Sequence, residues 1–122
     1  EYWLEEADND LKVAGNLFER EDYSYSLFFG HLALEKLFKA FYVKHARQHA
    51  PLIHNLERLA VSGGLDLTNE QKESLIKIST FNIEARYPDI KKSFRKQCTK
   101  EFTAKELDEI KKVYQWVKSK MK

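Results

Sequence analysis

The sequence predicts an all-α protein, an up-and-down bundle of four to five helices that dimerises. Apolar residues recur at helical spacing along most of the chain, and no segment shows the alternation of a convincing strand. Residues 26–44 carry apolar side chains around most of the circumference of a helix. In a chain of 122 residues of which 13% are aromatic, one small bundle does not easily cover such a helix, and this favours a dimer.

The first two helices are predicted over residues 2–20 and 23–45. The first has a single apolar stripe, whereas the second is apolar nearly all round and is therefore expected to be the central helix, wrapped on several sides. Because only residues 20–22 join them, the two helices are expected to be antiparallel neighbours. The stripe of the first helix consists of Trp3, Ala7, Leu11, Ala14 and Phe18.

Cap chemistry predicts where the third and fourth helices begin and end. A short third helix over residues 56–61 is closed by Gly63 and Gly64, in the place where a left-handed C-terminal cap needs glycine. The fourth helix opens at Thr68, whose spacing to Gln71 is that of a capping box.

The fifth helix is predicted to open with a second capping box, from Thr103 to Glu106, and to run through Met121. Pro88 is expected to end the preceding helical region. Residues 86–102 are therefore predicted to be a long irregular segment, and long irregular segments on a rigid scaffold often carry function.

Length and composition limit the class of protein. The chain has the size of one domain, so residues 1–122 are predicted to form a single domain. The single Cys98 excludes an internal disulfide framework and fits a reducing compartment, and no apolar run approaches the roughly 20 residues that span a bilayer. A cytoplasmic protein with no membrane contact is expected.

The sequence lacks the common catalytic and cofactor-binding motifs. It has no Gly-rich phosphate loop, no nucleophile elbow and no paired cysteines at metal spacing, so no cofactor is predicted. His45 and His49 are four residues apart, but without a third ligand they are read as solvated residues at a helix end. No metal site is predicted.

Charge is distributed unevenly along the chain, although the net charge is only +2. Residues 1–22 carry eight acidic residues against two basic ones, whereas residues 86–100 are basic. The basic segment predicts an anion-binding surface; the alternatives are a solvated surface, or a segment that packs beside the acidic first helix. The segment contains one acidic residue, Asp89. Its cations are Arg86, Lys91, Lys92, Arg95, Lys96 and Lys100.

A polar stripe runs along the otherwise apolar second helix. His31, Glu35 and Lys39 recur every four positions, with Lys36 beside them, and we interpret these four residues as candidates for ligand binding. The alternative is a simple helix ion pair between Glu35 and Lys39. A partly buried ion pair is costly unless it is well satisfied, so its presence on the most apolar helix needs a reason.

Arg86 and Tyr87 form a second candidate pair for ligand binding. A residue before proline favours an extended backbone, so this segment is expected to leave the fourth helix and to present a guanidinium and an aromatic ring together. Charge and stacking are what a nucleotide requires. The alternative is that Tyr87 packs over the end of the bundle while Arg86 pairs with Glu35 or another acid.

Arg47 and His54 have the R-x6-H spacing, the one arrangement in the chain suited to cleaving RNA without a metal. An imidazole can transfer the proton of a ribose 2′-hydroxyl or of the leaving oxygen, and a guanidinium can hold the phosphate as charge develops. The structural alternative for His54 is that it caps the third helix, which starts just after it.

Five sequence features together resemble the HEPN domain, named for higher eukaryotes and prokaryotes nucleotide-binding. They are Trp3, the segment DLKVA from Asp10, the segment HLALEKLFKAF of residues 31–41, the segment HNLERL of residues 54–59, and ARYPD of residues 85–89. The resemblance covers nearly the whole chain and is greatest to stand-alone prokaryotic members. It implies a bundle of four or five helices that pairs as a homodimer, is encoded beside a minimal nucleotidyltransferase, and takes nucleotide or RNA as ligand.

The resemblance also bears on the choice between binding and cleavage. Many HEPN proteins are metal-independent ribonucleases with an R-x4-6-H motif whose arginine precedes Asn, Asp or His, whereas Gln48 follows Arg47 here. The segments LEK (residues 34–36) and ARYPD match the branch without an assigned activity. The resemblance therefore implies binding of nucleotide or RNA, with a nucleotidyltransferase partner in a toxin–antitoxin-like system. The alternatives are a ribonuclease using Arg47 and His54, and an interaction subunit that docks through its basic segment.

Overall fold

The computed structural model describes residues 2–52 and 55–121, and within them every regular element is a helix. The all-α bundle predicted from the sequence is confirmed. The elements are α1 (Tyr2–Glu19), α2 (Tyr23–Ala46), α3 (Leu56–Ser62), α4 (Asn69–Ser79), the 3-10 helix η1 (Ile83–Ala85), α5 (Pro88–Gln97) and α6 (Lys100–Lys120).

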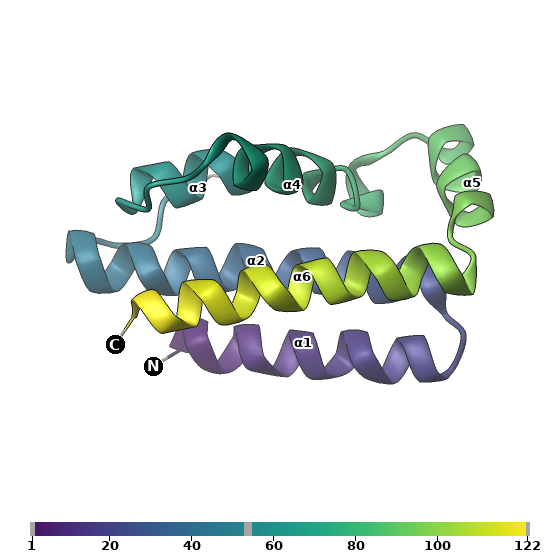
Figure 1. The fold of residues 1–122 in the computed structure, drawn as a ribbon, viewed down its shortest axis with the longest axis horizontal. Helices are drawn as coiled ribbons and strands as arrows, with labels where there is room; N and C mark the ends of the chain where they lie inside the picture. Colours follow the sequence, from purple (N-terminus) through teal and green to yellow (C-terminus); the bar gives the residue numbers. More distant parts are fainter. Residues whose placement is uncertain (1, 53–54, 122) are drawn as a thin grey trace.

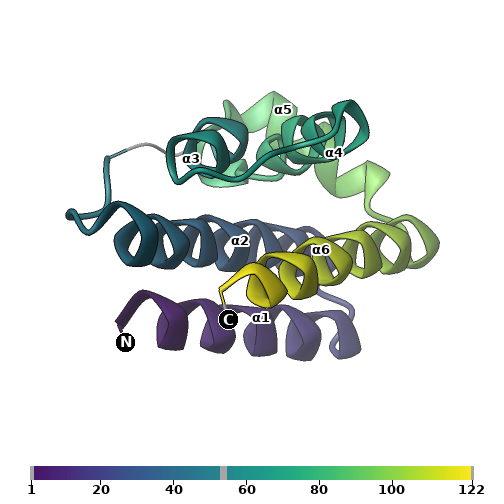
Figure 2. The ribbon, with the colours of Figure 1, turned by 60° about the vertical axis from the view of Figure 1, so that its left-hand side comes forward.

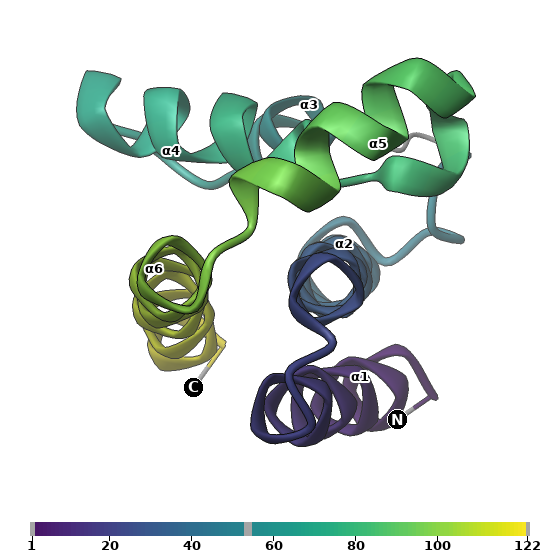
Figure 3. The same ribbon diagram turned by 90° about the vertical axis from the view of Figure 1, so that its right-hand side faces the viewer.

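Three long helices, α1, α2 and α6, run side by side, and the short helices cover one side of this group (Figure 1). Seen from the end, α2 lies between α1 and the layer formed by α3, α4 and α5 (Figure 3). Figure 2 shows the same layers from an intermediate angle. The α2 helix is thus the central helix, as its all-round apolar sequence predicted.

Specific contacts join the three long helices. A Cβ atom added at Gly30 would lie 2.9 Å from Cδ1 of Ile110, so the Ile110 side chain on α6 packs directly against the backbone of α2. Between α1 and α2, the hydroxyl of Ser26 donates to the carbonyl of Ala14 at 2.7 Å. Between α1 and α6, the hydroxyl of Tyr114 donates to the Asp8 carboxylate.

The predicted caps of the third and fourth helices are largely confirmed. Both hydrogen bonds of the capping box between Thr68 and Gln71 are present, and Gly64, just after α3, has a φ of +99°. The residue that caps α3 is Asn55, whose side chain accepts from the backbone N–H of Arg58. The cap expected at His54 therefore belongs to the next residue, and His54 itself lies outside the described residues.

The prediction for the last third of the chain was wrong in two respects. Residues 88–97 form α5 rather than part of an irregular segment, because Pro88 sits in the first turn of a helix, where its missing N–H costs nothing. The last helix begins at Lys100 and is capped by Thr99, which accepts from the N–H of Phe102. Thr103 is instead fully buried in the interior of that helix. Its spacing to Glu106 resembled a capping box because residues i and i+3 also share one face inside a helix.

None of the described helices combines the length and the apolar character that crossing a membrane requires.

Candidate functional site

The basic segment lies on α5, at one end of the bundle. Arg86 and Tyr87 precede the helix with extended backbones, at φ −105°, ψ 154° and φ −69°, ψ 155°. This confirms the extended conformation predicted from the following proline. The segment turns away from α4 through η1, and Pro88 then starts α5 across the end of α2 and α6 (Figure 3).

Few contacts fix α5 to the bundle, and none of its residues is fully buried. The ring of Phe94 stacks on that of Phe81, with centroids 5.5 Å apart. The guanidinium of Arg95 lies 5.8 Å from the ring centre of Tyr25 on α2, and its Nη2 donates to the Tyr25 hydroxyl at 3.4 Å. Phe94 therefore anchors the inner face of α5, while the cations of this helix remain on its outer faces.

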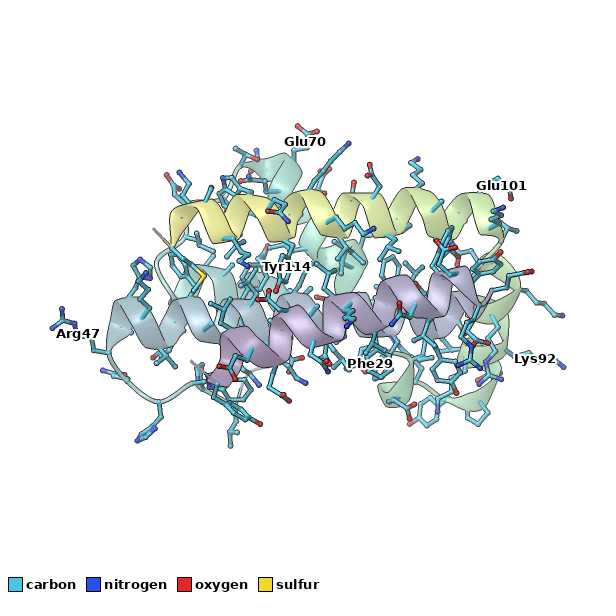
Figure 4. All side chains as sticks on the ribbon, turned by 90° about the horizontal axis from the view of Figure 1, so that it is seen from below. Phe29, Arg47, Glu70, Lys92, Glu101 and Tyr114 are labelled. Carbon is cyan, nitrogen blue, oxygen red and sulfur yellow. The ribbon has the colours of Figure 1, made fainter. Side chains whose placement is uncertain are left out.

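The cations of α5 and the tyrosine before it are open to solvent. Lys92, Arg95 and Lys96 are exposed and Lys91 is half-buried. Figure 4 shows Lys92 projecting from the end of the molecule. Tyr87 is 77% exposed, so the alternative in which it packs over the bundle end is wrong.

The acidic first helix does not neutralise this surface. The α2 helix separates α5 from α1 (Figure 3), so the alternative in which the basic segment packs beside the first helix is wrong. Acids of α1 instead contact Lys36 of α2, whose Nζ lies 2.7 Å from Asp10 Oδ2 and 3.7 Å from Glu6 Oε1. Burial alone would lower the pKa of Lys36, but the hydrogen bond and charge of Asp10 outweigh it and raise this pKa.

The polar stripe of α2 is enclosed by the fold. Glu35 lies between His31 and Lys39: its Oε1 is 3.8 Å from His31 Nε2 and its Oε2 is 3.2 Å from Lys39 Nζ. His31 is 1% exposed, Glu35 7% and Lys39 6%. The Lys39 ammonium also lies 5.2 Å from the ring centre of Trp3. The expected ion pair between Glu35 and Lys39 is thus present and nearly buried, and the role of the stripe in ligand binding stays a prediction.

Arg47 lies at the other end of the molecule. It ends α2 in a left-handed conformation, φ 56°, ψ 38°, and its N–H bonds to the carbonyl of Val43. Its side chain is exposed and lines a shallow hollow with Trp3 and His49. His54, its predicted catalytic partner, lies outside the described residues.

The two candidate regions are far apart within one chain. Figure 4 places Arg47 and Lys92 at opposite ends of the bundle. Tyr25, which contacts α5, lies 22 positions before Arg47 along α2, a helical rise of about 33 Å. One chain therefore does not bring Arg47 next to the basic surface of α5.

The described residues hold no cluster of three or more metal-ligating side chains. His45 stacks on Phe41, with centroids 3.9 Å apart, and its Nδ1 lies 3.0 Å from the Phe41 carbonyl. One ring nitrogen of His45 thus lies within hydrogen-bonding distance of a carbonyl of its own helix.

Two residues of the α5 region escaped the sequence analysis. The ring of Tyr25 on α2 is 39% exposed and meets Arg95, a contact that the sequence could not show because the two residues are far apart in the chain. Ile90 is 46% exposed and lines a groove between η1 and α5. No sequence signal predicted that groove, because it depends on how η1 and α5 lie relative to each other in the fold.

Comparisons with known proteins agree with the architecture and with the sequence motifs. The family model described as the HEPN domain matches residues 1–120. The crystal structure of TT1696 from Thermus thermophilus superimposes with a TM-score of 0.79, covering 97% of this chain and 94% of that chain. The two chains are 23% identical, so this likeness establishes the fold. A search of curated proteins gave no match. The resemblance inferred from the five sequence features is confirmed over almost the full length, and the chain belongs to the HEPN domain family.

Proposed function

We propose that this protein binds RNA through α5 and the residues that flank it. The observation that carries the proposal is a ten-residue helix with three exposed cations and a fourth that is half-buried, beside exposed tyrosine rings. We call this region the α5 surface. It comprises Tyr25, Arg86, Tyr87, Lys91, Lys92, Arg95 and Lys96.

Several lysines elsewhere in the described structure are paired with acids, whereas the cations of α5 are not. In α4, Lys77 lies 3.0 Å from Glu106 and 2.7 Å from Glu109, and in α6, Lys118 lies 3.4 Å from Asp8. Among the residues that the structure describes, the cations of α5 form no such ion pair. Residues 86–97 carry five cations against Asp89, a net charge of +4, which favours a polyanionic partner.

The size and chemistry of the α5 surface favour a polynucleotide. Ten helical residues span about 15 Å, so the cations reach beyond a single phosphate. The exposed tyrosines offer flat rings on which bases stack. Membership of the HEPN family, whose name refers to nucleotide binding, supports the same ligand class.

A charge-reversal experiment tests the proposal. Lys91, Lys92, Arg95 and Lys96 are replaced together by Glu, and binding of a labelled oligouridine of about 12 nucleotides is followed by fluorescence anisotropy over a salt series. Wild type is expected to bind more weakly as salt rises. The logarithm of its binding constant should fall with the logarithm of the salt concentration, with a slope of about 0.7 per phosphate contact on a single strand. The reversed protein is expected to lose this binding while circular dichroism shows unchanged helicity.

A matched control separates a local site from net charge. Reversing the exposed Lys12, Lys105, Lys111 and Lys120 changes the net charge by the same amount, from +2 to −6, away from α5. This control is expected to retain most of the affinity. Equal loss in both variants, or none in either, contradicts the α5 surface as the RNA-binding site.

The remaining inferences from the family resemblance are part of the proposal. These are a homodimer and a minimal nucleotidyltransferase partner in a toxin–antitoxin-like system, with the α5 surface as the RNA contact. The ribonuclease alternative, with Arg47 and His54, is read out in the same assay. We expect the oligouridine to be recovered intact in EDTA, whereas cleavage that Arg47→Ala abolishes would favour the enzyme.

A further inference from the structure

We propose that the α5 surface selects single-stranded RNA, by holding one unstacked base in the groove between η1 and α5 and stacking another on Tyr87. This inference rests on the proposed function and adds the strandedness of the ligand to it. A cationic surface alone would not make this distinction, because duplexes and single strands both present phosphates.

The groove has the size and lining of a base-binding site. It measures about 240 Å³, below the roughly 300–1,000 Å³ of pockets for drug-sized ligands, so it suits a fragment such as one base. Ile83, Ile90 and Phe94 give it apolar walls. Ser93 and Gln97 line it as well, with hydroxyl and amide groups that can bond to the edge of a base.

Fixed elements preform the groove. Ile83 is only 2% exposed, and Phe94 is held by its stacking on Phe81. Ile90 remains 46% exposed, which leaves apolar surface that a base would cover. Because the groove is already formed, binding a base there requires little loss of conformational entropy.

Tyr87, the residue just before α5, offers an open stacking platform at the start of that helix. Its carbonyl accepts the N–H of Ile90 at 3.0 Å, which ties the start of α5 to the residue that lines the groove. Its ring is 77% exposed, and the preceding residue, Arg86, lines the groove itself. In the proposal, the groove and the ring take two bases of one flexible strand at the start of α5.

The surrounding cations place the phosphates. Arg86 lies at the groove, and Lys91 is on the adjacent turn of α5. A flexible strand can lay its phosphates along these charges while its bases turn inward to the groove and to Tyr87. In a duplex the bases stay stacked and paired, and turning one out costs a few kcal/mol, which disfavours the same arrangement.

The experiment compares three probes of equal length at one salt concentration: an oligouridine strand, an RNA duplex and an abasic strand with the same phosphates. Wild type is expected to bind the oligouridine about tenfold or more tighter than the abasic strand or the duplex, as stacking of one base provides. Tyr87→Ala is expected to weaken oligouridine binding about tenfold, toward the affinity of the abasic strand, because one of the two base contacts is lost. The salt slope is expected to stay unchanged.

Two further variants make the result specific. Tyr87→Phe keeps the ring and is expected to retain the preference for the oligouridine. Tyr2→Ala removes another exposed tyrosine, 65% exposed at the start of α1, and is expected to bind like wild type. Circular dichroism of each variant verifies its fold.

The possible outcomes separate the two proposals. Equal affinity of wild type for all three probes, or a harmless Tyr87→Ala, overturns the single-strand inference while RNA binding by the α5 surface stands. Failure of wild type to bind any probe overturns the proposed function and this inference together.

Discussion

At the scale of single residues, Cys98 combines burial with a titratable group. It is 6% exposed, in the turn between α5 and α6, where it belongs to the hydrophobic core cluster. Burial raises the pKa of its thiol to about 11, against the lowering effect of a hydrogen bond to Thr103. Burial also raises the pKa of Tyr114, and its hydrogen bond to Asp8 adds to this shift. Both groups are held protonated in the folded protein.

These two pKa shifts predict a loss of stability in alkali. A folded-state pKa above the unfolded value means that the folded protein binds more protons, so the free energy of unfolding falls as pH rises above about 9. Cys98 is expected to account for a fall of about 2 kcal/mol in the free energy of unfolding between pH 9 and pH 11, since each pKa unit corresponds to about 1.4 kcal/mol. Urea denaturation at pH 8 and pH 11 measures the difference.

Cys98→Ala serves as the comparison for this pH dependence. The substitution lowers stability at pH 8 because it removes buried volume, but it is expected to flatten the fall between pH 8 and pH 11. An equally steep fall in the variant would contradict the assignment to the thiol and point instead to Tyr114 and to the ion-paired Lys36 and Lys77, whose pKa values are also raised.

At the scale of the elements, short helices depend on their caps more than long ones. The α3 helix has seven residues, and its first turn is closed by the side chain of Asn55. Asn55→Ala is expected to lower the free energy of unfolding by about 1 kcal/mol, because the N–H of Arg58 loses its acceptor. Thermal or urea denaturation measures this effect.

Asn9→Ala is the matched control for the cap. Asn9 is exposed in the interior of α1, where alanine has the higher helix propensity, so this substitution is expected to be neutral or slightly stabilising. Similar losses at Asn9 and Asn55 would mean that the cap of α3 contributes nothing specific.

At the scale of the whole molecule, one chain leaves its central helix incompletely covered. Several large apolar side chains of α2 are only half-buried by α1, α3, α5 and α6, and other large apolar side chains are exposed elsewhere. Those half-buried on α2 are Phe28, Phe29, Leu32, Tyr42 and Val43.

This incomplete burial supports the predicted homodimer. A second copy would cover apolar surface that a single bundle leaves in contact with water. Light scattering at micromolar concentration is expected to report twice the 14.4 kDa mass of one chain. A monomer throughout the micromolar range would contradict the prediction.

Much of the fold was predictable because it follows from local sequence. The apolar residues of α2 repeat with the helical period, and the capping box of Thr68 and Gln71 involves neighbours in the chain. The capping box predicted from Thr103 to Glu106 was wrong. Two residues spaced i, i+3 give the same sequence pattern at the start of a helix and on the buried face of its interior. Pro88 was misread for a similar reason, since proline both ends and begins helices.

The sequence alone was sufficient for the helical class, the central position of α2, the family and the concentration of charge in residues 86–97. Only the tertiary structure decided which charges are available to a ligand. It enclosed His31, Glu35 and Lys39 within the bundle and left the cations of α5 in solvent. Periodicity and caps are properties of neighbouring residues, whereas burial depends on which distant elements pack together, and no local pattern encodes that.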